Sequence, residues 1–159
     1  MADAPPLPPS SPSPNRRPTR RASADAAILD DWGRILLQRR KDVGKWGLPG
    51  GGIELDESAA QTVVREAREE TGYDVAVVRL VGVYTDPAHT TFRYPDGNVV
   101  QYVSLLFECR VTGGRPRTQA AEVTDMQWFA ADALPPDVLD DHRLRIADAF
   151  AGRAEVAVR

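Results

Sequence analysis

Hydrophobic and polar positions along the chain predict a domain that is mostly β-sheet. Short blocks rich in β-branched and apolar residues, bounded by turn formers, are typical of strands. Five such blocks cover residues 24–29, 34–39, 75–84, 99–111 and 125–129. Asp30-Asp31-Trp32-Gly33 separates the first two, which are therefore expected to pair as a hairpin. Pro95-Asp96-Gly97-Asn98 and Gly113-Gly114 predict two later turns.

Two blocks carry a helical pattern instead. In residues 56–71 the apolar side chains fall on one helical face, with Asp56 placed to cap the start and Gly72 the end. That face is made of Ala60, Val63, Val64 and Ala67. Residues 136–149 predict a final helix whose buried face is poorly defined. Strands with two helices and no internal repeat predict an α+β fold, a mixed-sheet α/β/α sandwich.

The first 20 residues differ from the rest of the chain. Seven of the thirteen prolines lie between Pro5 and Pro18, mixed with Ser and Ala, and little apolar area is available for burial. We therefore expect residues 1–20 to be a disordered, proline-rich tail, followed by one domain over residues 21–159. The tail ends in a basic cluster interpreted as solvated, with weak anion or partner binding as the alternative. Its members are Arg16, Arg17, Arg20 and Arg21.

Composition excludes several function classes. The 159 residues suffice for one domain that needs no disulfide, and the net charge of −3 offers no basic field for nucleic acid. No apolar stretch approaches the roughly 20 residues of a membrane span or forms the core of a signal peptide. We expect a cytoplasmic protein without nucleic-acid or membrane partners, its oligomeric state open and a homodimer among the alternatives. The single cysteine, Cys109, is expected in the core.

Glu66, Glu69 and Glu70 place three carboxylates on the last turns of the predicted 56–71 helix. At about 100° per residue they share an arc of roughly 100°, more than about 90° from the apolar stripe. Like charges at these spacings repel, and the helix dipole disfavours negative charge at this end. A divalent cation would offset both effects, because hard cations such as Mg²⁺ prefer oxygen ligands and share them with substrate phosphates.

An acidic helix face is most often simply solvated, so the carboxylates alone are a weak indication. Here they follow residues 44–52, which contain five glycines and a proline and predict a loop with special backbone geometry. Glycines let a backbone carbonyl approach an ion, or let N–H groups approach a phosphate. Loop and carboxylates together favour metal-assisted chemistry on a phosphate substrate.

This region resembles the Nudix box, the signature of the Nudix hydrolases. The matching segment is GGIELDESAAQTVVREAREETGY, from Gly51 to Tyr73. All fixed positions of the motif are met, by Gly51, Glu57, Arg65, Glu66, Glu69, Glu70 and Gly72. Two variable apolar positions depart mildly, since Ala67 is small and Tyr73 is amphipathic. The flanking patterns agree over roughly residues 23–150.

The resemblance implies a Nudix fold and a metal-dependent hydrolase. It implies that Mg²⁺ or Mn²⁺ is bound by the backbone carbonyl of Gly51 and by Glu66, Glu69 and Glu70. It also implies that Arg65 pairs with Glu57 and orients Glu66. The catalytic candidates are therefore Arg65, Glu69, Glu70 and, from a later loop, Glu122.

The general base differs between branches of the family and stays open here. Glu122 lies six residues before Trp128, in the right sort of loop, and is one candidate. Glu69 and Glu70 are the alternatives, and a metal-bound water needs little further help. Without such a role, Glu122 is an exposed loop acid.

The expected substrate is a nucleoside diphosphate linked to another moiety, such as ADP-ribose, a nucleotide sugar or a dinucleoside polyphosphate. The alternatives are (oxidised) nucleoside triphosphates, or a non-catalytic regulatory module that only binds nucleotide. Four cations before the box either pair with phosphates or form a solubilising rim. They are Arg39, Arg40, Lys41 and Lys45.

The aromatic residues and histidines are less informative. Phe92, Tyr94 and Tyr102 are candidates for stacking on a base, although Tyr102 is expected in the core. Packing is the expected role of the tryptophans Trp46 and Trp128. No role is assigned to the histidines His89 and His142.

Overall fold

The computed structural model describes residues 18–94 and 97–159. Most of the segment predicted to be a disordered tail therefore lies outside the described residues, as do Pro95 and Asp96 of a predicted turn. The first strand, β1 (Thr19–Ile28), begins before the boundary expected at residue 21, because it pairs with a later strand from Thr19 onward. Disorder of the preceding residues stays a prediction.

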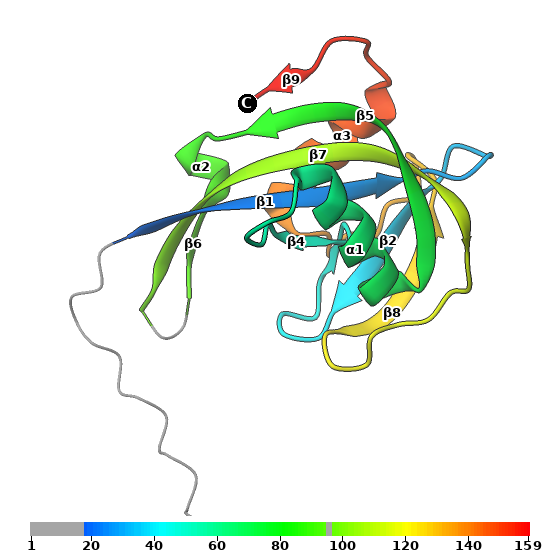
Figure 1. Cartoon of the computed structure of the whole chain (residues 1–159), viewed down its shortest axis with the longest axis horizontal. Coiled ribbons are helices and arrows are strands. Elements are labelled where there is room, and N and C mark those ends of the chain that lie inside the picture. Colours follow the sequence, from blue (N-terminus) through cyan, green and yellow to red (C-terminus); the bar gives the residue numbers. More distant parts are fainter. Residues whose placement is uncertain (1–17, 95–96) are drawn as a thin grey trace, which may run out of the picture.

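A six-stranded mixed sheet forms the centre of the domain (Figure 1). Its strands are β1, β4 (Gly50–Gly52), β5 (Tyr73–Tyr84), β6 (Thr91–Arg93), β7 (Val99–Gly114) and β9 (Ala157–Val158). They follow the order β4-β1-β7-β5-β9, and β6 also pairs with β7. β1 runs parallel to β7, whereas β5 and β7 are antiparallel. The predicted turn at Gly113-Gly114 lies within the end of β7.

A second, smaller sheet packs beside the first. It has three antiparallel strands, β3 (Trp46–Gly47), β2 (Ile35–Arg40) and β8 (Val123–Phe129), with β2 in the middle. The glycine-rich segment predicted as loop thus contributes short strands to both sheets, β3 to the smaller and β4 to the larger. It is the point at which the chain passes from one sheet to the other.

The predicted hairpin between the first two strands is wrong. β7 pairs along one edge of β1, and β4 pairs with Ser23–Asp25 on the other edge, so β2 does not extend along β1 as a hairpin partner. The tight turn still forms, since the Asp30 carboxylate accepts hydrogen bonds from the N–H groups of Trp32 and Arg34. Beyond it only a single bridge, Leu29 to Ile35, joins the two segments before β2 enters the smaller sheet.

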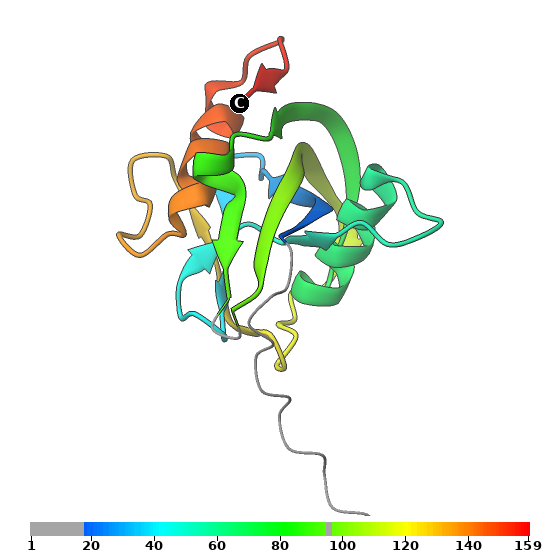
Figure 2. The same ribbon diagram turned by 90° about the vertical axis from the view of Figure 1, so that its left-hand side faces the viewer.

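Helices cover both faces of the larger sheet, as the two perpendicular views show (Figure 1, Figure 2). α1 (Ala59–Thr71) lies on one side and α3 (Asp140–Ala151) on the other, while α2 (Pro87–Thr90) is a short turn between β5 and β6. The predicted α/β/α arrangement is therefore confirmed. Within residues 18–94 and 97–159, no helix has the length and apolarity needed to cross a bilayer.

The first helix begins later than predicted. Ser58, not Asp56, is its N-cap: the Ser58 hydroxyl accepts the N–H of Gln61, and the Gln61 side chain accepts the N–H of Ser58. Asp56 has a φ of 66°, which places it outside helical geometry. The predicted end is confirmed, because Gly72 adopts a left-handed φ of 76° and closes the helix.

The buried face of α1 also differs from the prediction. Val64 is 39% exposed, whereas Glu70 is only 5% exposed. Val63, Ala67 and Glu70 follow one another at i, i+4 and i+7, so they share one helical face. One of the three carboxylates therefore lies on the packed stripe rather than away from it.

The final helix starts at Asp140 rather than at residue 136. Residues 136–137 form a turn, and Val138 makes a single bridge to Trp46 of β3. The N–H of Trp46 donates to the Asp137 carbonyl at 3.0 Å, and the N–H of Leu139 donates to the Trp46 carbonyl at 2.8 Å. These bonds fix the chain in a geometry that a helix cannot share.

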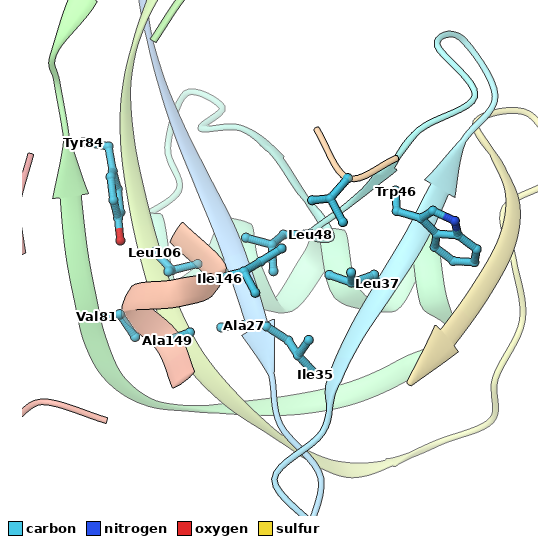
Figure 3. Packing of buried hydrophobic residues seen from close by; sticks show 11 residues of the cluster. Ala27, Ile35, Leu37, Trp46, Leu48, Val81, Tyr84, Leu106, Ile146 and Ala149 are labelled. Atoms are coloured by element: carbon cyan, nitrogen blue, oxygen red, sulfur yellow. The ribbon is translucent and has the colours of Figure 1, made fainter. Parts of the chain in front are cut away.

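Two hydrophobic clusters lie on opposite faces of the larger sheet. The first joins Ile146 of α3 to the sheet through Leu106 and to β2 through Leu37, and Trp46 packs into its edge (Figure 3). The second packs α1 against the sheet and contains the fully buried Cys109, as expected. Burial raises the pKa of the Cys109 thiol to about 12, so it is not a nucleophile at neutral pH.

Truncation of the first cluster tests this account of stability. Ile146 is fully buried, so Ile146→Ala should leave a cavity and lower the free energy of unfolding by about 2–5 kcal/mol. Urea denaturation measures the change. Leu55→Ala is the matched control, because Leu55 is 95% exposed and its truncation should have almost no effect. Equal losses in the two variants would contradict the assignment of the core.

Candidate metal and active site

The three predicted carboxylates differ in exposure along the end of α1, beside β4. Glu70 is buried, and its Oε2 accepts the N–H of Gly50 at 2.9 Å. The Glu66 side chain is 15% exposed, and its Oε1 accepts from the Arg65 guanidinium at 2.8 Å. Glu69 is half exposed and lies 3.5 Å from the same guanidinium. Exposure of the three carboxylates thus increases from Glu70, which is buried, through Glu66 to Glu69.

Two of the three glycines in β4 leave no room for a side chain. A Cβ on Gly51 would overlap the Glu66 carboxylate, and a Cβ on Gly50 would collide with the Ala24 carbonyl of β1. The absence of side chains lets the β4 backbone approach the carboxylates directly. The three carboxylates near the end of α1 offer oxygen atoms of the kind that a hard divalent cation prefers.

Arg65 connects the loop before α1 to the carboxylates. Its Nε and one terminal nitrogen contact the two Glu57 oxygens at 3.0 and 2.7 Å, a bidentate pair, while the other nitrogen contacts Glu66. Glu57 also accepts the Thr62 hydroxyl at 2.8 Å. The hydrogen bonds from Arg65 lower the pKa of Glu57 to about 2. Arg65 therefore holds Glu57 in its charged form and contacts Glu66 on its other side.

The electrostatics of the buried carboxylates favour a cation. Burial raises the pKa of Glu70 to about 8, although hydrogen bonds from Gln38 and Gly50 act in the opposite direction. Burial likewise raises the pKa of Glu66, against the effect of Arg65. The neighbouring carboxylates, including that of Glu122, raise both values further. Positive charge placed among them would relieve this repulsion.

The carboxylates do not form a closed cage. Among residues 18–94 and 97–159, no three acidic, His or Cys side chains converge closely enough to enclose a metal ion. Glu66 is turned toward Arg65, and Glu69 extends into solvent. Mg²⁺ commonly takes one or two carboxylates and completes its shell with water and substrate phosphates. The donor set therefore fits an open site that a phosphate substrate would complete.

A cavity of about 1000 Å³ opens beside these carboxylates. Glu66, Glu70 and Glu122 line it, and so do Arg40 and Lys41 at the end of β2. The Lys41 N–H donates to the Glu122 carbonyl at 2.8 Å, which ties the late loop to β2. The predicted loop acid is thus brought to the same cavity as two of the helix carboxylates, Glu66 and Glu70, whereas Glu69 does not line it.

Three aromatic residues line another part of the cavity. The rings of Phe92 and Tyr102 meet edge to face at 5.6 Å, and the hydroxyls of Tyr94 and Tyr102 lie 2.9 Å apart. The expectation that Tyr102 belongs to the core is wrong, because it is only half buried and faces the cavity. Burial, followed by the Tyr94 hydroxyl, raises the pKa of Tyr102 to about 12, so the phenol stays neutral.

Comparison with known proteins decides the family. A family model described as the NUDIX domain matches residues 19–150. The chain belongs to the Nudix family. The match begins with β1 and ends in α3, so it spans the whole sandwich described above.

Named relatives and a solved structure agree. The chain is 35% identical over 135 residues to a MutT-like protein of Streptomyces ambofaciens, covering 85% of this chain and 80% of that protein. It is 33% identical over 126 residues to an ADP-ribose pyrophosphatase of Methanocaldococcus jannaschii, covering 77% and 70%. The crystal structure of an ADP-ribose pyrophosphatase from Streptococcus suis is similar at 26% identity with a TM-score of 0.71, covering 87% and 98%.

These findings make this Nudix protein a pyrophosphohydrolase that acts on phosphoanhydride bonds. The family implies a small-molecule nucleotide as substrate and a general need for divalent metal ions. The fold, the hydrolase class and the family expected from the Nudix box are thereby confirmed.

Not all predicted substrate residues of this Nudix protein reach the cavity. Arg39 donates to the Gly44 carbonyl at 2.9 Å and contacts Asp137 at 3.3 Å. Neither Arg39 nor Lys45, both among the described residues, lines the cavity, whereas Arg40 does. Trp46 lies in the core as expected, edge to face with Phe129 at 5.1 Å.

Several cavity residues escaped the sequence-based prediction. Arg145 of α3 is buried and donates to Asp25 at 2.8 Å and to the Ser104 hydroxyl at 3.3 Å. His142 lines the cavity as well, and its Nδ1 accepts the Leu48 N–H at 2.8 Å. Burial lowers the pKa of His142, which keeps the imidazole neutral as this bond requires. In the sequence, only the position of Asp25, a charged residue within an apolar strand, indicated that a buried cation such as Arg145 would be needed.

The contact between Arg65 and Glu57 predicts a pH dependence of stability. The pKa of Glu57 falls from 4.5 to about 2 on folding, so its contribution is fully present above pH 4.5 and is lost as pH falls towards 2. Wild type and Glu57→Gln should therefore differ in unfolding free energy at neutral pH, with the gap closing through this window. Chemical denaturation at several pH values measures the gap, and a gap independent of pH would contradict the ion pair.

Proposed function

We propose that this protein hydrolyses the diphosphate of a nucleoside diphosphate linked to another moiety, such as ADP-ribose, a nucleotide sugar or a dinucleoside polyphosphate. The observation that carries the proposal is the cavity of about 1000 Å³. It is lined by carboxylates, by three aromatic side chains and by three buried polar side chains, namely Glu66, Glu70, Phe92, Tyr94, Tyr102, Asp25, Ser104 and Arg145. Ligand sites commonly measure about 300–1,000 Å³, so this one has room for groups on both sides of a diphosphate. The ADP-ribose pyrophosphatases among its relatives support the same class.

In this proposal, Mg²⁺ or Mn²⁺ is held by Glu66, Glu69, Glu70 and the Gly51 carbonyl. A bound divalent ion would neutralise the diphosphate and lower the pKa of a coordinated water. Arg65 orients Glu66 through its 2.8 Å contact and opposes the rise in the pKa of Glu66 that burial causes. Oxygen donors next to a buried, crowded carboxylate support this assignment.

The proposed reaction is the attack of water on one phosphorus of the diphosphate. The bond from that phosphorus to the bridging oxygen breaks, and the leaving phosphate retains the oxygen. The proton lost by the water passes to a carboxylate, for which we propose Glu122. Its place in the cavity and its effect on the pKa values of Glu66 and Glu70 support this role, with Glu69 and Glu70 as the alternatives.

Arg40 and Lys41 are the proposed partners of the substrate phosphates, since both line the cavity. Arg40 is held by Asp42 through two contacts of 3.0 and 2.7 Å, which fixes its position but offsets part of its charge. The aromatic group of Phe92, Tyr94 and Tyr102 is the proposed place for a base. The cytoplasmic location expected from the sequence remains part of this proposal, and the oligomeric state stays open.

A substrate panel tests the reaction. ADP-ribose, a nucleotide sugar, a dinucleoside polyphosphate and an oxidised purine triphosphate are each incubated with Mg²⁺, Mn²⁺ or chelator, and nucleotide and phosphate release are measured. We expect metal-dependent cleavage of the first three classes to exceed that of the triphosphate, and chelator to abolish it. Preference for the triphosphate would replace the proposed substrate class. Binding without turnover across the panel would favour a regulatory module.

Variants of the carboxylates test the residue roles. Glu69→Gln and Glu70→Gln should fold but lose turnover by about 100-fold or more, because each removes a proposed metal ligand. Glu122→Gln should lose turnover while retaining metal binding, if Glu122 is the base. Steady-state kinetics at saturating metal measures the losses, with Glu155→Gln at an exposed, remote position as control. Full activity in both Glu69→Gln and Glu70→Gln would refute the metal-site assignment.

A further inference from the structure

We infer that Gln38 is a positioning residue that holds the Glu70 carboxylate in its metal-binding orientation. The inference rests on the proposed function, because it assigns Glu70 to the metal. Gln38 does not line the cavity, so it acts only through Glu70. Neither the helix nor the glycine loop carries this residue, which comes from β2 in the smaller sheet.

The pleat of β2 brings Gln38 to Glu70. Leu36 belongs to the cluster that packs against α1, whereas Leu37 belongs to the cluster on the other side. Side chains alternate along a strand, so Gln38 points to the same side as Leu36. On α1, Glu70 follows Ala67 on the face that Leu36 helps to cover. Leu36 of β2 and Ala67 of α1 belong to the same apolar cluster. Gln38 and Glu70 are the next residues on those two faces, so they lie beside that cluster.

Two donors among the described residues act on the buried carboxylate. The Gly50 N–H donates to Glu70 Oε2 at 2.9 Å. The Gln38 side chain lowers the pKa of Glu70, as a hydrogen-bond donor beside that carboxylate does. The donors come from different strands, β2 and β4, so the carboxylate is fixed from two directions. A ligand fixed in this way binds a metal ion without first losing side-chain freedom.

Packing alone does not explain why a glutamine, with its amide oxygen Oε1, is buried at position 38. The side chain is 2% exposed, and among the described residues its Oε1 has no hydrogen-bond partner. An unsatisfied buried oxygen destabilises a fold, and an apolar residue of the same shape would avoid that loss. The presence of an amide at this position is explained if the N–H group of Gln38 positions the Glu70 carboxylate for metal binding.

Manganese binding to the full-length protein tests the inference. Gln38→Met keeps the shape of the side chain and removes the donor, while Gln38→Asn keeps an amide that is one methylene too short. Gln127→Met is the matched control, because Gln127 is an exposed glutamine on the neighbouring strand β8. Mn²⁺ affinity is measured without substrate, by titration followed by electron paramagnetic resonance, and thermal unfolding is measured in chelator.

We expect both Gln38 variants to bind Mn²⁺ about 10- to 100-fold more weakly than wild type. In chelator, the melting temperature of Gln38→Met should stay close to that of wild type, because the substitution removes the unsatisfied oxygen together with the donor to Glu70. Raising the Mn²⁺ concentration should restore most of the turnover, because the ligand itself is still present. Gln127→Met should match wild type in every measurement.

Glu70→Gln separates failure of this inference from failure of the proposed function. If Glu70→Gln weakens Mn²⁺ binding while both Gln38 variants bind as wild type does, the positioning role is refuted and the metal site stands. If Glu70→Gln itself binds Mn²⁺ as wild type does, both assignments fall. Loss of Mn²⁺ affinity in the Gln38 variants that is matched by Gln127→Met would also overturn the inference.

Discussion

A carboxylate buried on the packed face of a helix determines much of the structure around it. α1 covers the central sheet with Val63 and Ala67, and Glu70 follows on the same face. Once Glu70 is buried, hydrogen-bond donors must reach it, and the N–H of Gly50 does so at 2.9 Å. That approach depends on two glycines of β4, because a Cβ on Gly50 would collide with β1 and a Cβ on Gly51 would overlap the Glu66 carboxylate. The glycine-rich segment and the acidic helix therefore depend on each other, because the buried carboxylate of the helix needs the backbone donor that the glycine-rich segment supplies.

The same burial prepares the site for positive charge. It raises the pKa of Glu70 to about 8, and the nearby carboxylates of Glu66 and Glu122 act in the same direction. Arg65 offsets part of this repulsion, but its bonds to Glu57 keep it at the side of the carboxylates. The remaining repulsion is a source of affinity for a divalent ion and its bound phosphate.

The chemistry of this protein was readable from its sequence because the Nudix box is local. Its charged positions fall on one helix and the loop before it, where spacing determines geometry. Strand pairing was less accessible: the turn at Asp30 was recognised, but pairing across β1 depends on β4 and β7, which arrive later in the chain. Arg145 meets Asp25 across 120 positions, and no periodicity predicts such a contact. Gln38 was equally hidden, since a single amide between Leu37 and Arg39 carries no local signal.

The alternation of side chains along β2 has a consequence for how this domain tolerates change. Ile35 and Leu37 serve one layer of the core, while Leu36 and Gln38 serve the layer beneath α1. Insertion or deletion of one residue in this strand would exchange the two sets. Leucine would then meet the Glu70 carboxylate, and an amide would enter the apolar layer beneath α3. A change in the length of β2 should therefore disturb both layers of the core at once, whereas a single substitution in the strand disturbs only the layer that its side chain faces.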